Sequence, residues 1–188
     1  MQPEYPTPEH GTRIVVSPSK IALGTGAVTE VGDYADLYGN KALVVATQQI
    51  FDFYGEEILE TLRDSGIEAV TYTDVRPDPT ITNIEEAYEL WRTEDCDVIV
   101  TLGGGSSIDT GKGVGVLATN PGSIREFAVD RAGYEGVPNP TPPLVAVNTT
   151  AGTGSEATRS IVVSDDETST KFLIVSQNVV PDVAIEDP

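Results

Sequence analysis

Cysteine and histidine are almost absent from this chain, which contains one of each among 188 residues. A single cysteine, Cys96, permits no internal disulfide, so we expect a small buried side chain and a reducing compartment, the cytoplasm. One histidine, His10, cannot form a histidine-rich metal site, and the chain has no Cys-x-x-Cys, His-x-x-x-His or Ser/His/Asp set. We therefore expect no catalytic residue and no metal ligand in this chain.

Long apolar runs are also missing. No segment approaches the roughly 18 apolar residues needed to cross a bilayer. The N-terminus lacks the basic patch and apolar segment of a secretory signal, and its prolines predict a flexible tail over residues 1–12. The remaining residues, 13–188, suit one well-buried domain better than two.

Basic residues are scarce. Eleven lysines and arginines stand against 30 acidic residues, which gives a formal net charge of −19. Such a surface repels nucleic acid and anionic membranes, so neither is expected as a partner. At about 1 M salt the Debye length falls to about 3 Å and self-repulsion is screened. The hypothesis is a halophilic protein from a salt-loaded cytoplasm, and the alternative is an ordinary acidic protein.

The most informative stretch is an apolar run followed by three glycines. Val98–Leu102 is β-branched and apolar, as is typical of a buried parallel strand. Gly103–Gly105 has no Cβ atoms, so a ligand can approach the backbone closely. Ser106 and Asp109 have the spacing of a capping box, which predicts a helix start. Together these features predict an anion site, most simply for phosphate; a tight turn that binds nothing is the alternative.

Two stricter phosphate-binding patterns do not fit this turn. A P-loop has glycine six residues before its lysine and a hydroxyl residue after it, whereas Ser106 precedes Lys112 and Gly113 follows it. A Gly-x-Gly-x-x-Gly fingerprint that starts at Gly103 would need its third glycine at Ile108. The turn therefore belongs to neither of these classes.

Strand and helix patterns alternate along the chain. The expected strands are Arg13–Val16, Lys20–Leu23, Lys41–Thr47, Ile67–Thr73, Val98–Leu102, Leu144–Asn148 and Val179–Ile185. The expected helices are Ala27–Leu37, Gln49–Ser65, Thr82–Arg92 and Ser106–Thr119. Arg159–Val163 and Lys171–Val175 flank an acidic turn, as the strands of a hairpin do. This order predicts an α/β protein with a doubly wound, mostly parallel, Rossmann-like sheet and a β-hairpin near the C-terminal end.

A second stretch, Asn148–Glu156, repeats the arrangement of strand, small residues and capping box. Here Thr153 and Glu156 have the capping-box spacing, which predicts another helix start. Open α/β sheets bind ligands at the carboxyl ends of their strands, so the two helix starts are expected to face one crevice. Hydroxyl groups of Ser106, Thr149, Thr150 and Thr153 add neutral donors for a phosphate or a ribose. Two unrelated capped helices are the alternative.

Gly103–Lys112 together with Asn148–Glu156 resembles the paired cofactor motifs of the iron-containing (metal-dependent, group III) alcohol dehydrogenase family. Ile21–Ala27 and Pro181–Ala184 also resemble its pattern, and the similarity covers residues 13–188. The resemblance implies the NAD(P)-binding domain of an oxidoreductase that interconverts alcohols with aldehydes or ketones. It also implies that iron or another divalent metal is held by a helical C-terminal domain absent from this chain, which alone would be catalytically incomplete.

Other proteins of this fold stay open as alternatives. Dehydroquinate synthases and glycerol dehydrogenases share it, although their second motifs read differently. A stand-alone nucleotide-binding module without chemistry is the remaining alternative. In the favoured case the partners are the dinucleotide and a small alcohol or aldehyde, and a homodimer stays open.

The resemblance assigns roles to residues of the first motif. Gly104, Gly105 and Ser106 would contact the pyrophosphate. Asp109 is a motif residue for which capping and direct contact with the cofactor are equally open. Lys112 would give structural or long-range electrostatic support.

In the later motifs, the resemblance places Thr149, Thr150 and Thr153 along the adenosine and phosphate path. Lys171 would reach the ribose on the nicotinamide side.

The residue that ends the second expected strand bears on cofactor choice. An acidic side chain there would bind the ribose 2′-hydroxyl and reject a 2′-phosphate. The matching residue is Thr47, and no carboxylate follows before Asp52. The expectation is NADP or NAD with a lean toward NADP, although no arginine stands ready to bind the phosphate.

Overall fold

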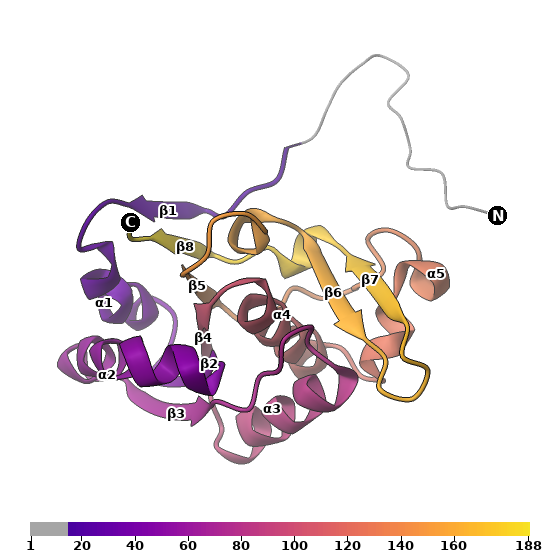
Figure 1. Ribbon diagram of the computed structural model, residues 1–188, viewed down its shortest axis with the longest axis horizontal. Coiled ribbons are helices and arrows are strands. Elements are labelled where there is room, and N and C mark those ends of the chain that lie inside the picture. The colour runs from indigo at the N-terminus through magenta and orange to yellow at the C-terminus, as the bar shows by residue number, and fades with distance from the viewer. Residues whose placement is uncertain (1–14) are drawn as a thin grey trace.

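The computed structural model describes residues 15–188, whose core is a six-stranded parallel sheet (Figure 1). Its strand order is β1-β8-β5-β4-β2-β3, and every neighbouring pair is parallel. The strands are β1 (Lys20–Leu23), β2 (Lys41–Ala46), β3 (Glu68–Tyr72), β4 (Val98–Gly103), β5 (Leu144–Asn148) and β8 (Val183–Glu186). The predicted α/β class with a parallel sheet is confirmed.

Helices cover both faces of the sheet (Figure 1). The α-helices are α1 (Val31–Asp36), α2 (Gln48–Asp64), α3 (Ile81–Thr93), α4 (Gly105–Thr119) and α5 (Val129–Ala132). The shorter 3₁₀ helices are η1 (Ala27–Glu30), η2 (Ile124–Phe127), η3 (Ser155–Ala157) and η4 (Gln177–Val179). Successive side chains of a strand point to opposite faces. Val44 of β2 therefore packs with α1 and α2, whereas its neighbour Val45 packs with α3 and α4.

The predicted hairpin near the C-terminal end is confirmed. β6 (Ser160–Ser164) and β7 (Lys171–Val175) pair antiparallel as a separate two-stranded sheet. Their buried side chains form a third core with the C-terminal half of α4 and with η2. The hairpin consequently lies beside the main sheet, next to α4 (Figure 1).

Several boundaries differ from the prediction. Val15 and Val16 belong to no strand, whereas Arg13, Ile14 and the predicted tail over residues 1–12, including His10, lie outside the described residues. The expected helix Ala27–Leu37 divides into η1 and α1. The last strand begins only at Val183, because η4 and Pro181 interrupt the apolar run before it.

The strand register brings the sequence motifs to one rim of the sheet. Gly103 at the end of β4 lies opposite Asn148 of β5, and Asn148 lies opposite Glu186 of β8. Thr47 follows β2 on the other side of β4. This is the rim at which open α/β sheets bind their ligands.

Candidate cofactor site

The glycine turn after β4 brings bare backbone to the rim. Gly103 has a φ of +139°, a conformation that residues with a side chain rarely adopt. The predicted capping box at Ser106 is wrong, because α4 begins at Gly105 and its N-cap is Gly104. Ser106 therefore lies inside the first turn, and Gly104 has no side chain with which to occupy the free N–H groups. No side chain caps the N–H groups at the start of α4, and uncapped helix N-termini of this kind are typical anion sites.

The turn is in direct contact with the stretch after β5. The backbone N–H of Thr149 donates to the carbonyl of Gly103 at 3.1 Å. A Cβ atom on Gly104 would lie 2.5 Å from Thr150 Oγ1, and one on Gly105 would lie 3.0 Å from Thr153 Cγ2. Larger residues would push the two stretches apart. The two motifs therefore lie in contact at this rim, although only the first of them is the start of an α-helix.

The predicted helix after Thr153 is wrong. Gly152 and Gly154 both have positive φ and turn the chain sharply. Only the short η3 follows before β6, so no N-terminal helix site exists here. Thr153 accepts a hydrogen bond from the N–H of Ser155 at 3.3 Å, and one carboxylate oxygen of Glu156 is buried with no partner among the described residues. Two glycines so close together favour a turn over a stable helix.

A cavity of about 390 Å³ lies between the start of α4, the stretch after β5, and β6. It is lined by Asp78, Pro79, Gly105, Ser106, Asp109, Thr153, Ser155, Thr158, Ser160, Val162 and Ser164. Of the predicted cofactor residues, Gly105, Ser106, Asp109 and Thr153 line this cavity, whereas Gly104 and Thr150 lie close to each other outside its lining.

Asp109 joins α4 to β6 instead of capping the helix. Its Oδ2 accepts the N–H of Val162 at 2.9 Å, while Oδ1 is buried and has no partner among the described residues. Burial raises the pKa of Asp109, and the nearby ammonium of Lys112, the N–H of Val162 and the side chain of Ser155 oppose that rise. The structure thus presents a cavity-lining carboxylate beside a buried ammonium.

Lys112 is fully buried behind the cavity wall. Its ammonium donates to the carbonyls of Thr158 at 2.7 Å and Ser160 at 3.1 Å. Burial lowers the pKa of Lys112 to about 8, against the opposing attraction of Asp109 and Glu156. This position agrees with the structural support predicted for Lys112.

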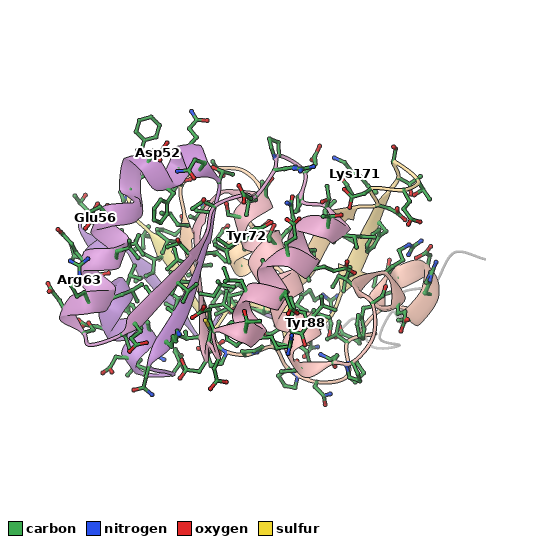
Figure 2. The ribbon with its side chains drawn as sticks, turned by 90° about the horizontal axis from the view of Figure 1, so that it is seen from below. Asp52, Glu56, Arg63, Tyr72, Tyr88 and Lys171 are labelled. Carbon is green, nitrogen blue, oxygen red and sulfur yellow. The ribbon has the colours of Figure 1, made fainter. Side chains whose placement is uncertain are left out.

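Lys171 forms an ion pair with Asp78, which lines the cavity and for which the sequence predicts no role. The Lys171 ammonium lies 2.7 Å from a carboxylate oxygen of Asp78, whose backbone N–H donates to Ser106 Oγ at 3.3 Å. Asp78 has a φ of +59°, which is uncommon for a residue with a side chain. Figure 2 shows Lys171 projecting at the same rim as Asp52 of α2. The sequence Pro77–Pro79 after a predicted strand is the signal that could have placed Asp78 here.

Thr47 and Thr149 lie at the same rim but outside the cavity lining. Thr47 is the N-cap of α2, and its hydroxyl accepts the N–H of Ile50 at 3.3 Å. The side-chain amide of the following residue, Gln48, donates a hydrogen bond to Asp52 and accepts one from the hydroxyl of Thr73. No carboxylate occupies the position of Thr47 itself, as the sequence indicates. The cavity-lining residues Thr158, Ser160 and Val162 were missed, because a strand edge carries no local signal of the helix that packs on it.

Two negative findings apply to residues 15–188. No helix in that range is long and apolar enough to cross a membrane. Within the same range, no three His, Cys, Asp or Glu side chains are grouped closely enough to hold a metal ion.

A parallel sheet with helices on both faces, and a glycine turn at the carboxyl ends of its strands, defines a doubly wound α/β protein, a class whose members bind ligands at that rim. Comparison with known proteins then gives the family. The family model for iron-containing alcohol dehydrogenases matches residues 18–188, and the chain belongs to that family.

Known relatives share this similarity over nearly the whole chain. The 1,3-propanediol dehydrogenase of Klebsiella pneumoniae is 43% identical over 170 residues, which cover 88% of this chain and 43% of that protein. The NAD-dependent methanol dehydrogenase of Bacillus methanolicus is 35% identical over 179 residues, 94% of this chain and 46% of that protein. A crystal structure of 1,3-propanediol oxidoreductase superposes with a TM-score of 0.90 at 42% identity, over 94% of this chain and 46% of the other. The chain therefore spans less than half the length of these relatives.

Proposed function

We propose that this chain is the nicotinamide-dinucleotide-binding part of an enzyme that interconverts an alcohol with an aldehyde or ketone. The observation that carries the proposal is the contact between the glycine turn and the threonine stretch at the rim of the sheet. Gly104 and Gly105 lie so close to Thr150 and Thr153 that a Cβ atom would not fit without displacement. Such a bare cradle beside the start of a 15-residue helix suits a diphosphate.

The residues present also fit the rest of such a cofactor. Gly104, Gly105 and Ser106 would hold the diphosphate, since the first-turn N–H groups of α4 are the donors available there. Asp109 Oδ1 is a buried acceptor without a partner among the described residues, and it suits a hydroxyl or amide donor of the nicotinamide half. Lys171, next to the cavity, would contact the ribose of the same half.

Three threonines and Thr47 complete the proposed site. Thr149, Thr150 and Thr153 would line the path of the adenosine and phosphate groups, and Thr47 would lie beside the adenosine ribose. When bound, the nicotinamide ring supplies the acceptor or donor of hydride. The chain itself binds and orients that ring, and we assign it no catalytic residue.

We propose that the site admits both NAD and NADP. Thr47 leaves room for a 2′-phosphate, which a carboxylate at this position would repel. The lean toward NADP rests on that residue alone, and the Bacillus methanolicus relative is named NAD-dependent. Both cofactors therefore belong in the first titration.

The described residues do not fit the metal that the family name implies. They contain no group of three metal-ligating side chains, so no step of the chemistry is derived through a metal here. This chain spans less than half of the length of its relatives. We propose that metal and substrate are held by a further part of the full-length protein, which corresponds to the remaining half of those relatives. Hydride transfer by these 188 residues alone is accordingly not expected.

We make two further proposals about the setting of the protein. A net charge of −19 suits the salt-loaded cytoplasm of a halophile, and a single cysteine suits a reducing one. A homodimer stays a proposal, to be tested by light scattering at low and molar KCl.

Calorimetric titration with NADH and with NADPH, in roughly 2 M KCl to screen self-repulsion, tests the proposed function. We expect saturable binding of at least one cofactor with one site per chain. Adenosine diphosphate serves as a partial ligand that occupies the adenosine and diphosphate part of the site and lacks the nicotinamide half. If neither dinucleotide binds to the full-length protein, the proposal is wrong.

A further inference from the structure

The outer edge of β6 is bonded along most of its length by side chains of α4, and at its end by backbone, where the N–H of Ser164 donates to the carbonyl of Pro79 at 2.8 Å. Alternate residues of an antiparallel strand turn their backbone groups away from the partner strand. On β6 the carbonyl of Ser160 and the N–H of Val162 point outward in this way. Lys112 donates to that carbonyl at 3.1 Å, and Asp109 accepts that N–H at 2.9 Å.

The two α4 side chains act from one face of the helix. Asp109 and Lys112 are three residues apart, a spacing that makes side chains neighbours on an α-helix. Lys112 is 0% exposed and Asp109 is 6% exposed, so neither charge is solvated by bulk water. Lys112 also bonds the carbonyl of Thr158 at 2.7 Å. Thr158, Ser160 and Val162 all line the cavity, whereas Lys112 does not.

We propose that Lys112 is a positioning residue of the cofactor pocket, which fixes its β6 wall and keeps the Asp109 carboxylate ionised without touching the ligand. The inference rests on the proposed cofactor binding and deepens it. Lys112 acts on the wall through the carbonyls of Thr158 and Ser160, and on Asp109 through its charge. Protonation would turn one carboxylate oxygen of Asp109 from a hydrogen-bond acceptor into a donor. That oxygen could then no longer accept a hydrogen bond from a donor of the cofactor.

The charge balance around Lys112 supports this role. The charged groups that face it are Asp109 on its own helix and Glu156 of η3, one carboxylate oxygen of each being buried without a partner among the described residues. Buried carboxylates are stable as anions only when a positive charge or donors compensate them. Lys112 is the cation that acts on both, and its positive charge opposes protonation of Asp109.

The test uses the full-length protein and measures the dissociation constant of NADH from about pH 6 to about pH 9. In Lys112→Met, the lost charge raises the pKa of Asp109 further. We expect NADH binding about tenfold weaker near pH 7. The loss should shrink as the pH rises, because Asp109 ionises in the variant and Lys112, whose pKa burial lowers to about 8, loses its charge in the wild type. Lys112→Gln keeps a donor for the carbonyls but no charge, and it should show the same pH-dependent loss if Lys112→Met folds poorly.

A double-mutant cycle separates positioning from simple structural support. Asp109→Asn should weaken binding at every pH, and Lys112→Met should then add less than about a twofold further loss. Lys41→Met is the matched control, because Lys41 pairs with Glu94 at 2.9 Å at the opposite end of β2 and should leave NADH binding unchanged.

Three results would overturn the inference. A loss in Lys112→Met that is equal at all pH values and undiminished in the Asp109→Asn background would show a purely structural lysine. If the wild-type protein binds NADH and both Lys112 variants bind it equally well, the inference is rejected while the proposed function stands. Absence of NADH binding in the wild-type protein would instead reject the proposed function, and this inference with it.

Discussion

Gly104 and Thr150 are far apart in sequence but follow adjacent parallel strands, and a Cβ atom on Gly104 would lie 2.5 Å from the Oγ1 of Thr150. The backbone of Gly104 itself is extended, with φ −88° and ψ −161°, and any residue could adopt it. Glycine is therefore needed here for close approach, and backbone conformation gives no separate reason for it.

Gly104→Ala should separate the two stretches that form the cradle. We expect the free energy of unfolding to fall by about 1–3 kcal/mol, because the added methyl overpacks the contact. Titration with NADH should show an affinity about tenfold lower or worse, which corresponds to about 1.4 kcal/mol. The double variant Gly104→Ala/Thr150→Ala makes room for the methyl and should regain stability. If it also regains full affinity, Gly104 serves packing and not ligand approach.

Thr47→Asp should make the site selective for NADH. The new carboxylate would accept a ribose 2′-hydroxyl and repel a 2′-phosphate, so NADPH affinity should fall about tenfold or more while NADH affinity is kept. Asp is as good an N-cap as Thr, so α2 should stay stable. Thr47→Asn is the uncharged control of equal size and should change the NADPH affinity much less. Equal losses in both variants would mean that charge at this position does not select the cofactor.

Cys96 should make stability depend on alkaline pH. Burial raises the pKa of its thiol from 9.0 to about 11, so between these values the folded state binds more protons than the unfolded state. The contribution of Cys96 is fully present below about pH 9 and is lost toward pH 11, by about 1 kcal/mol per pH unit. Denaturant unfolding at several pH values should show a shallower alkaline decline in Cys96→Ala. An identical decline would contradict the prediction.

The net charge of −19 should make stability depend on salt. Molar KCl shortens the Debye length to about 3 Å and screens the repulsion among the carboxylates. Thermal unfolding should therefore shift upward by several degrees between low and molar KCl, each kcal/mol being worth about 2–4 °C in a domain of this size. The same salt step near pH 5, where fewer carboxylates are ionised, should shift the midpoint less. No upward shift at neutral pH would rule out the halophile hypothesis.

The sequence predicted the elements whose pattern is local. The run Val98–Leu102 and the glycines after it gave the strand and the turn, and the apolar spacing of Thr82–Arg92 gave most of α3. Local spacing misled at the two capping boxes. At Ser106 the helix starts two residues too early for a serine cap, and after Thr153 the chain turns at Gly154 into η3.

By itself, the sequence determined the parallel α/β class, the paired glycine and threonine motifs and the family resemblance, because strand, turn and helix signals depend on neighbouring residues. Only the tertiary structure decided that Asp109 and Lys112 bond the edge of β6, and that Asp78 joins Ser106 to Lys171. Lys112 and Thr158 are 46 positions apart, and no local spacing encodes their contact. Burial between packed elements, and the need to satisfy the backbone groups and charges buried there, created those contacts.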